Sequence, residues 1–196
     1  MGVKGEKTRK RIVSKSLQLF TVQGYFNTSI NDILDATGLT KGGLYGHFRS
    51  KEDIWYAVYD HAVRIWREIV FRGTRKVDDP LLRLETIVRR NLEDYLGADV
   101  FDGGCFFFNM LTELSGQSSS MSRRILSGFV RFSKLIQAWL EEARRKGKLK
   151  PETDIREAAD FIIVATNGAA PLYAASRDPN IWKLTYHQLR IYLQGL

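Results

Sequence analysis

Residues 29–48 decide the fold of this chain, and they read SINDILDATGLTKGGLYGHF. The run predicts two short helices joined by a turn, because glycine at the turn is typical of a helix-turn-helix and Gly38 stands there. Apolar residues at Ile33, Leu39 and Leu44 are spaced to lock the two helices together. The segment therefore has the pattern of a helix-turn-helix.

The second helix of this pair begins after Thr40 and leaves Lys41, Tyr45 and His47 free to project from it. A helix of this kind enters a DNA major groove with its N-terminal end toward the base edges. Lys41 stands in the first turn, where a cation opposes the helix dipole, and this favours a partner anion. Two alternatives stay open: Tyr45 only stacks on the first helix of the chain, and His47 only bridges to the helix that follows.

Helical patterns continue on both sides of this pair. Upstream, a helix is expected over residues 7–23, and downstream Ser50 begins another that runs to about residue 72. Further helices are expected over 80–97, 104–115, 121–146, 155–176 and 180–194. Four prolines in 196 residues, without an alternating strand pattern, favour helices throughout. We therefore expect an all-α fold of about nine helices.

The composition is that of an ordinary globular protein, with 44% hydrophobic and 27% charged residues. A single cysteine excludes an internal disulfide. No stretch approaches the roughly 18 apolar residues that a membrane span needs, and the N-terminus lacks the apolar segment of a signal peptide. We expect a cytoplasmic protein.

The net charge of +8 is concentrated near the start of the chain. Residues 1–50 hold eight Lys and Arg against three Asp and Glu. The basic residues that gather there are Lys4, Lys7, Arg9, Lys10, Arg11 and Lys15. Taken alone, this cluster fits either a solvated helix face or a surface that faces phosphates.

Residues 8–53 resemble the DNA-binding domain of TetR-type repressors without a gap. The shared pieces are Thr8-Arg9-Lys10-Arg11-Ile12, Leu19-Phe20, Gly24-Tyr25, Thr28-Ser29-Ile30, Asp32-Ile33, Ala36-Thr37-Gly38-Leu39, Lys41-Gly42, Leu44-Tyr45, His47-Phe48 and Ser50-Lys51-Glu52. Two positions depart from the pattern: Leu34 stands where such domains usually carry Ala, and Gly46 where relatives often carry a large side chain. The resemblance implies a helix-turn-helix DNA-binding domain over residues 1–50 and a helical effector-binding and dimerisation domain over residues 51–196.

The resemblance also implies which residues meet DNA. The helix that begins at Thr40 and is expected to end near His47 would be the recognition helix. Three glycines inside it, Gly42, Gly43 and Gly46, make it weak alone, because each costs about 0.8–1.0 kcal/mol relative to Ala. Its backbone would then approach phosphates closely, unless flanking helices simply tolerate the glycines. The implied DNA-binding residues are Thr28, Ser29, Thr40, Lys41, Gly42, Gly43, Tyr45, His47 and Lys51.

Aromatic residues crowd the helices of the second domain, and three adjacent phenylalanines at 106–108 cannot all face one side of a helix. Most of these residues form a core, but the resemblance implies that some line a cavity that binds a small effector. The expected lining residues are Tyr59, Trp66, Phe106, Phe107, Asn109, Met110, Glu113, Phe129, Phe132, Trp139 and Asn167. No cofactor is expected, and the three histidines are too scattered in the sequence to suggest a metal site.

Residues 161–173 are apolar on nearly every side of a helix, which predicts burial on more than one face. The resemblance implies that residues 155–194 form a four-helix bundle with a second copy of the chain, and the alternative is a buried helix within one protomer. In the dimer, glutamate at Ala169 or Leu189 would disrupt the interface.

Cys105 follows Gly103-Gly104 at the predicted start of a helix, where the helix dipole lowers the pKa of a thiol. A repressor that senses oxidants or electrophiles through Cys105 is therefore one alternative, and a small buried hydrophobic residue is the other.

Sequence motifs typical of enzymes are missing, among them the Gly-x-Ser-x-Gly elbow, His-Glu-x-x-His, the Walker loop and the dinucleotide fingerprint. A helical enzyme that binds a small molecule is thus the weaker alternative. The sequence predicts a transcriptional repressor that leaves a palindromic operator in double-stranded DNA when a small apolar or aromatic effector binds.

Overall fold

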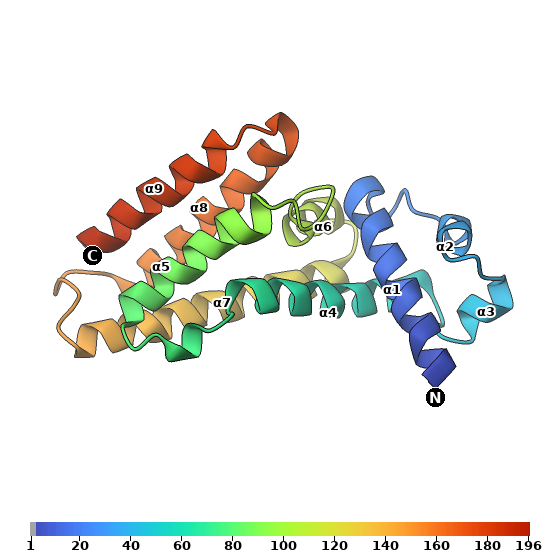
Figure 1. The fold of residues 1–196 in the computed structure, drawn as a ribbon, viewed down its shortest axis with the longest axis horizontal. Helices are drawn as coiled ribbons and strands as arrows, with labels where there is room; N and C mark the ends of the chain where they lie inside the picture. Colours follow the sequence, from blue (N-terminus) through green and yellow to red (C-terminus); the bar gives the residue numbers. More distant parts are fainter. Residues whose placement is uncertain (1–2) are drawn as a thin grey trace.

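The computed structural model describes residues 3–196, apart from the side chains of Val3, Lys4 and Ser119, and this part of the chain forms nine α-helices and no strand (Figure 1). The α-helices are α1 (Val3–Gln23), α2 (Ile30–Thr37), α3 (Lys41–Tyr45), α4 (Lys51–Val70), α5 (Pro80–Arg90), α6 (Phe106–Leu114), α7 (Ser119–Arg145), α8 (Ile155–Ser176) and α9 (Asn180–Gly195). The all-α fold expected from the sequence is confirmed. None of the described helices is long and apolar enough to cross a membrane.

Helices α1, α2 and α3 gather at one end of the molecule, whereas α5, α7, α8 and α9 run side by side at the other (Figure 1). Helix α4 joins the two ends: it packs against α1 and also against α5 and the segment that follows α5. The C-terminal end of α4 lies far from α3 (Figure 1).

Three elements differ from the sequence expectation. The helix expected over 80–97 is α-helical only to Arg90 and continues as a π-helical segment, η2 (Asn91–Leu96). A short 3-10 helix, η1 (Thr74–Lys76), lies in the expected loop between α4 and α5. Helix α3 is five residues long, ending at Tyr45, because glycine is a poor helix former and Gly46 follows directly.

Side-chain caps start several helices at the expected places. Ser29 Oγ accepts a hydrogen bond from Asp32 N at 3.1 Å, and an Asp32 oxygen accepts one from Ser29 N at 2.7 Å, so the two residues form a capping box at the start of α2. Ser50 Oγ accepts from Asp53 N at 3.0 Å at the start of α4. Asp154 caps α8 in the same way.

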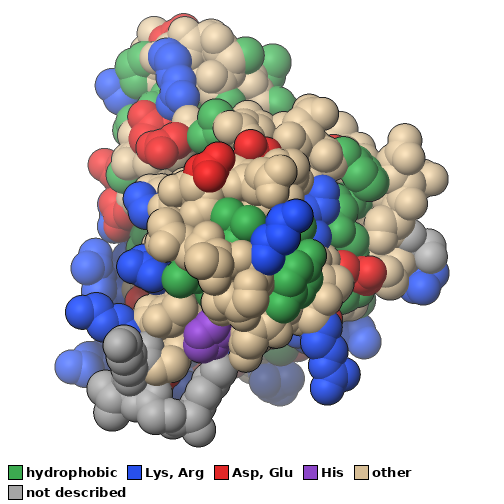
Figure 2. Space-filling view, turned by 90° about the vertical axis from the view of Figure 1, so that its right-hand side faces the viewer, with side chains coloured by type: hydrophobic (Ala, Val, Ile, Leu, Met, Phe, Trp, Pro, Cys, Tyr) green, Lys and Arg blue, Asp and Glu red, His purple; other side chains and the backbone are tan. Residues whose placement is uncertain are grey.

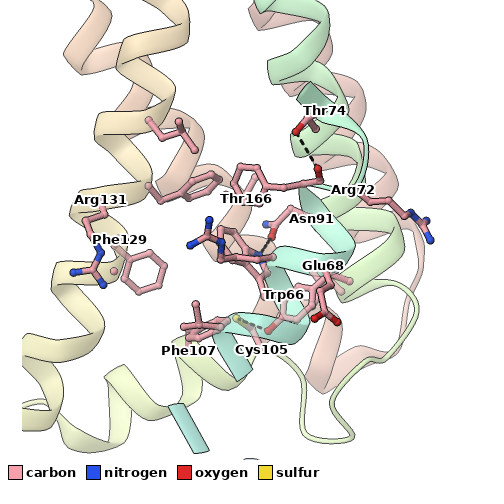
Figure 3. Close-up of a pocket in the computed structure, with 18 of the residues that line it drawn as sticks. Trp66, Glu68, Arg72, Thr74, Asn91, Cys105, Phe107, Phe129, Arg131 and Thr166 are labelled. Atoms are coloured by element: carbon pink, nitrogen blue, oxygen red, sulfur yellow. Dashed lines mark hydrogen bonds between the residues drawn. The ribbon is translucent and has the colours of Figure 1, made fainter. Parts of the chain in front are cut away.

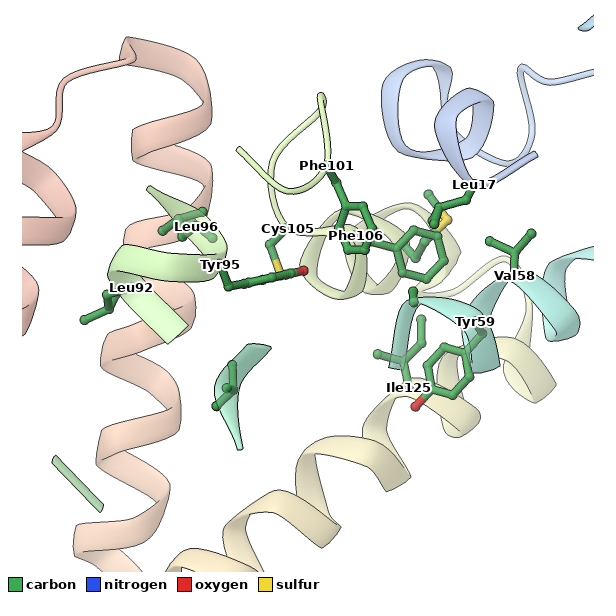
Figure 4. Close-up of a cluster of buried hydrophobic side chains, with 14 of the residues drawn as sticks. Leu17, Val58, Tyr59, Leu92, Tyr95, Leu96, Phe101, Cys105, Phe106 and Ile125 are labelled. Carbon is green, nitrogen blue, oxygen red and sulfur yellow. The ribbon is translucent and has the colours of Figure 1, made fainter. Parts of the chain in front are cut away.

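One buried apolar cluster runs from α1 to α9 and holds both ends of the molecule. Figure 4 shows Phe106 of α6 directed toward Leu17 of α1 and Val58 of α4. Phe106 is fully buried, whereas Phe107 is only half-buried and faces elsewhere. The three adjacent phenylalanines therefore divide between the core and a second apolar surface, as their spacing requires.

Candidate functional site

The turn between α2 and α3 has the geometry that the sequence predicts. Gly38 has φ of 63°, a left-handed conformation that glycine adopts without strain, and Leu39 N donates to Leu34 O at 3.2 Å. Ile33 and Leu44 are fully buried between the helices, and Leu39 is half-buried. The two helices are therefore held in one fixed orientation.

The exposed face of α3 carries the residues expected to meet DNA. Thr40, Lys41, Gly42 and Tyr45 are exposed, and half of the Tyr45 surface is open to solvent. In the described part of the chain no ring contact joins Tyr45 to α1. Thr40 also caps α3, because its hydroxyl oxygen accepts from Gly43 N at 3.2 Å. The amide of Gly43 is thus already used within the helix.

His47 lies at the edge of this face and is half-buried. Its Nδ1 atom is buried and has no hydrogen-bond partner among the residues that the structure describes. A bridge from His47 Nδ1 to α4 is therefore absent from this arrangement.

Two residues that the resemblance placed on phosphates lie inward instead. Thr28 is fully buried, and its hydroxyl donates to Gly24 O at 2.6 Å. The ammonium of Lys51 donates to Tyr25 O at 2.8 Å and to Thr28 O at 2.9 Å. Burial lowers the pKa of Lys51. These two side chains hold the loop between α1 and α2, and only Ser29 of the expected phosphate contacts stays exposed there.

Basic side chains flank this end of the molecule. Figure 2 looks onto the end that carries α2 and α3, and it shows Lys and Arg along the lower and left edges, with most Asp and Glu nearer the top. On α1 the exposed basic residues are Lys7, Arg9, Lys10, Arg11 and Lys15. Lys10 pairs with Glu6 at 2.9 Å, and the Arg9 guanidinium lies 4.6 Å from the Phe48 ring centre. The side chain of Lys4 lies outside the described residues.

A cavity of about 850 Å³ opens between α4, η2, α6, α7 and α8 (Figure 3). Eight aromatic residues line it, and seven of the eleven expected residues belong to the lining. These seven are Tyr59, Trp66, Phe107, Phe129, Phe132, Trp139 and Asn167. Its size is within the range of small-molecule sites, about 300–1,000 Å³.

Four expected residues lie outside the cavity lining. Phe106 and Met110 are in the core, where Met110 Sδ accepts from Trp55 Nε1 at 3.5 Å. Asn109 Nδ2 donates to Gly103 O at 2.7 Å and fixes the loop before α6. Glu113 lies at the far end of α6. The reason is the orientation of α6, which turns Phe107 toward the cavity and the opposite face toward the core.

Glu113 connects α6 to the DNA-binding end of the chain. Its two carboxylate oxygens accept from Tyr25 N and Phe26 N, each at 2.8 Å. Gly24 makes this approach possible, because a Cβ atom there would lie 2.8 Å from Glu113 Oε1. One short helix therefore contacts the cavity through Phe107 and the loop before α2 through Glu113.

Several cavity residues had no counterpart in the sequence expectation. Asn91 and Thr166 line the interior, and five cations line the cavity as well: Arg67, Arg72, Arg75, Lys76 and Arg131. Arg72, Arg75 and Lys76 stand close together in the sequence, in a segment with the composition of an ordinary loop, whereas Arg67 and Arg131 lie in helices. Asn91 starts the π-helical segment, which the sequence did not reveal.

Cys105 lies at the N-cap position of α6 and lines the cavity, but it is buried. Burial raises the pKa of its thiol, and backbone hydrogen bonds from α6 only oppose this. The expectation that the helix dipole lowers the pKa is therefore wrong. Tyr95 donates its hydroxyl to Cys105 Sγ at 3.7 Å.

Large apolar side chains are exposed along the last two helices. Phe161, Val164 and Leu172 share one stripe of α8, since their spacing follows the helical repeat. Leu184 and Ile191 are exposed on α9. Ala169 and Leu189, in contrast, are buried within the protomer, so glutamate at either position would disrupt the protomer itself.

Known families match most of the chain. A family model described as bacterial regulatory proteins of the tetR family matches residues 12–58. A second, described as the tetracyclin repressor-like C-terminal domain, matches residues 80–189. The two models correspond to the helix-turn-helix end and to the end that holds the cavity.

Individual proteins are similar over nearly the same length. An uncharacterized HTH-type transcriptional regulator from Lactococcus lactis is 29% identical, covering 93% of this chain and 91% of that protein. The transcriptional repressor ComR of Escherichia coli is 29% identical over 79% of this chain and 73% of its own.

Solved structures share the fold. A TetR transcriptional regulator from Chloroflexus aurantiacus has a TM-score of 0.91 at 29% identity, covering 97% of this chain and 96% of that one. AibR, solved in complex with isovaleryl coenzyme A and operator DNA, has a TM-score of 0.74 at 18% identity, covering 96% and 100%. From the matched family models, the chain belongs to the TetR family of bacterial transcriptional regulators.

Proposed function

We propose that this regulator is a homodimeric repressor that binds a palindromic operator and releases it when a small apolar or aromatic molecule enters the cavity. Its family consists of DNA-binding regulators and not of enzymes. The observation that carries the proposal is Glu113, because its carboxylate links α6, which lines the cavity, to the loop that begins the helix-turn-helix.

The DNA contacts are assigned to the exposed residues of the helix-turn-helix: Ser29, Thr40, Lys41, Gly42 and Tyr45. Lys41 stands in the first turn of α3, has no ion-pair partner among the described residues and is free to meet a phosphate or a guanine. Thr28 and Lys51 support this surface by holding the α1–α2 loop. Operator DNA lies in the cytoplasm of a bacterium, and the proposal places the protein there.

The dimer is assigned to residues 155–194. The stripe of exposed apolar residues on α8 and α9 supports this, since a contiguous apolar surface of that kind marks an interaction site. A symmetric pair of such helices would bury well over about 1,000 Å², and its two-fold axis would relate two recognition helices. AibR, a structural neighbour, was solved with operator DNA and a ligand together, which is the pair of partners proposed for this chain.

Release would follow a movement of α6. A ligand in the cavity pushes against Phe107, α6 shifts, and Glu113 pulls on the amides of Tyr25 and Phe26. The same shift of α6 takes place in the second protomer. The two recognition helices therefore move apart and no longer fit adjacent major grooves. A cavity-bound electrophile would also reach Cys105, and this keeps covalent sensing as a second candidate.

Selection of duplexes from a random pool by the full chain tests the proposal. We expect the enriched sequences to form one palindrome with half-sites about one helical turn apart or slightly more. Enrichment of no sequence, or of a site without two-fold symmetry, would refute a dimeric operator-binding repressor.

A further inference from the structure

The orientation of the Asn91 side chain gives the cavity an inward hydrogen-bond donor. Trp66 Nε1 donates to Asn91 Oδ1 at 2.7 Å. An indole N–H can only donate, so the Asn91 atom that faces it must be the oxygen. The amide nitrogen is therefore turned away from Trp66, and Figure 3 shows the Asn91 side chain pointing into the cavity. A donor of this kind is complementary to an acceptor oxygen on a ligand.

The other interior polar groups each donate a hydrogen bond within the protein. Thr166 Oγ1 donates to Ile162 O, and Asn167 Nδ2 donates to Ile163 O, both at 2.8 Å. Tyr59 donates its hydroxyl to Arg124 O at 3.3 Å. Asn91 Nδ2, in contrast, has no hydrogen-bond partner in the part of the chain that the structure describes. Asn91 also begins the π-helical segment, a feature that often occurs at functional sites.

Cations dominate the charged part of the lining. Five Lys and Arg residues line the cavity, they are exposed, and Glu68 is the one carboxylate beside them. We call the four at Arg67, Arg75, Lys76 and Arg131 the cationic rim. Within the described residues none of the four is in ion-pair distance of a carboxylate, whereas Arg83, Arg89 and Arg124 nearby are all paired.

DNA binding does not account for these charges. The loop after α4 that carries Arg75 and Lys76 lies at the end of the molecule away from α3 (Figure 1). Like charges that line one cavity repel one another and raise the local concentration of anions. An anionic ligand would neutralise the cationic rim.

We propose that the effector is an amphipathic organic anion, with an aromatic or acyl body between the aromatic walls and an acidic group drawn by the cationic rim. One acceptor oxygen of the ligand takes the hydrogen bond that Asn91 Nδ2 offers. This inference rests on the proposed function only in calling the ligand an effector; the binding preference itself does not depend on DNA.

Three probes with the same ring test the preference: 2-naphthylacetate, 2-naphthaleneethanol and 2-naphthaleneethylamine, titrated calorimetrically into the full chain at low salt. We expect the acid to bind at least about tenfold more tightly than the amine, with the alcohol between them, because only the acid gains from both the donor and the cations.

Asn91→Asp is the sharpest variant. The new carboxylate still accepts from Trp66 but replaces the inward donor by a negative oxygen, so the preference for the acid over the amine should shrink although the cationic rim is intact. The double variant Arg67→Gln/Arg131→Gln should also reduce the preference for the acid. Arg123→Gln is the matched control, because Arg123 is exposed on the same helix as Arg131 but does not line the cavity. Thermal melts verify that each variant is folded.

Equal binding of the amine and the acid by the wild type, an acid preference that neither set of substitutions reduces, or no binding of any probe would overturn the inference. The two proposals fail separately. A chain that selects an operator without preferring the acid refutes only this inference, and a chain that prefers the acid without selecting DNA refutes only the proposed function.

Discussion

Two lysines ten residues apart, Lys41 and Lys51, have opposite surroundings. Lys41 is exposed at the start of α3, whereas the ammonium of Lys51 is held by two carbonyls of the α1–α2 loop and lies 4.3 Å from the Tyr25 ring centre. At the scale of single residues, exposure separates a residue that meets a partner from one that shapes the surface.

We expect Lys41→Ala to weaken operator binding and to flatten the dependence of log affinity on log salt by about one unit if Lys41 meets a phosphate. If it meets a guanine instead, one base position should lose specificity at about 1–3 kcal/mol. Lys51→Met serves as the contrast: it should lower the melting temperature and leave the salt slope unchanged. Titrations at several salt concentrations measure both. Wild-type affinity and specificity in Lys41→Ala would contradict the placement of α3 on DNA.

Cys105 yields a prediction about pH. Burial raises the pKa of its thiol, so the folded state holds the proton more tightly than the unfolded chain does. The resulting stabilisation is present below the ordinary thiol pKa of about 8.5 and is lost as the pH rises above it. The free energy of unfolding should therefore fall more steeply at alkaline pH in the wild type than in Cys105→Ala, measured by denaturant titration. Parallel pH profiles would show that the thiol is not buried.

At the scale of elements, α6 divides its residues between three tasks. Phe106 and Met110 fill the core, Phe107 lines the cavity, and Glu113 binds the loop before α2. Hydrogen bonds to a charged group contribute about 1.5–3 kcal/mol each, so the two amides on Glu113 make a firm connection.

Gly24→Ala tests this connection, with Gly116→Ala as its control. Both glycines have positive φ, 86° and 77°, so both substitutions carry the same kind of backbone strain. Only at Gly24 does the new Cβ meet a neighbour, the Glu113 carboxylate. We expect a larger drop in melting temperature for Gly24→Ala, and we expect Glu113→Ala to relieve part of it in the double variant. Equal drops in melting temperature for the two variants would show that the Glu113 carboxylate does not lie against Gly24.

The sequence predicts those elements whose signals are local. The capping box at Ser29, the glycine at the turn and the buried Ile33 and Leu44 all follow from the single stretch of residues 29–44. The roles of Glu113 and Asn91 depend on partners 88 and 25 residues away, Tyr25 and Trp66. Such contacts leave no spacing pattern in one chain. Burial raises the pKa of Cys105 despite the helix dipole. The sequence could not predict this burial, because the helices that surround the thiol are distant from it in sequence.

At the scale of the whole molecule, the exposed stripe on α8 and α9 predicts a dimer. Val164 and Leu172 are 69% and 61% exposed in the protomer, so glutamate at either position is compatible with its fold. We expect Val164→Glu or Leu172→Glu to produce folded monomers in sedimentation velocity, whereas Ala169→Glu should yield misfolded protein, since Ala169 is buried. A Val164→Glu/Leu172→Glu protein that remains dimeric would place the interface on another surface.

The central claim is that this protein couples occupation of the cavity to its affinity for DNA. The most direct test is the affinity of the full chain for its selected duplex, with and without saturating 2-naphthylacetate, while calorimetry confirms that the acid is bound. The account predicts that the bound acid weakens DNA binding by about 5- to 150-fold, the usual range of coupling between two sites. An unchanged DNA affinity with the cavity filled would contradict it.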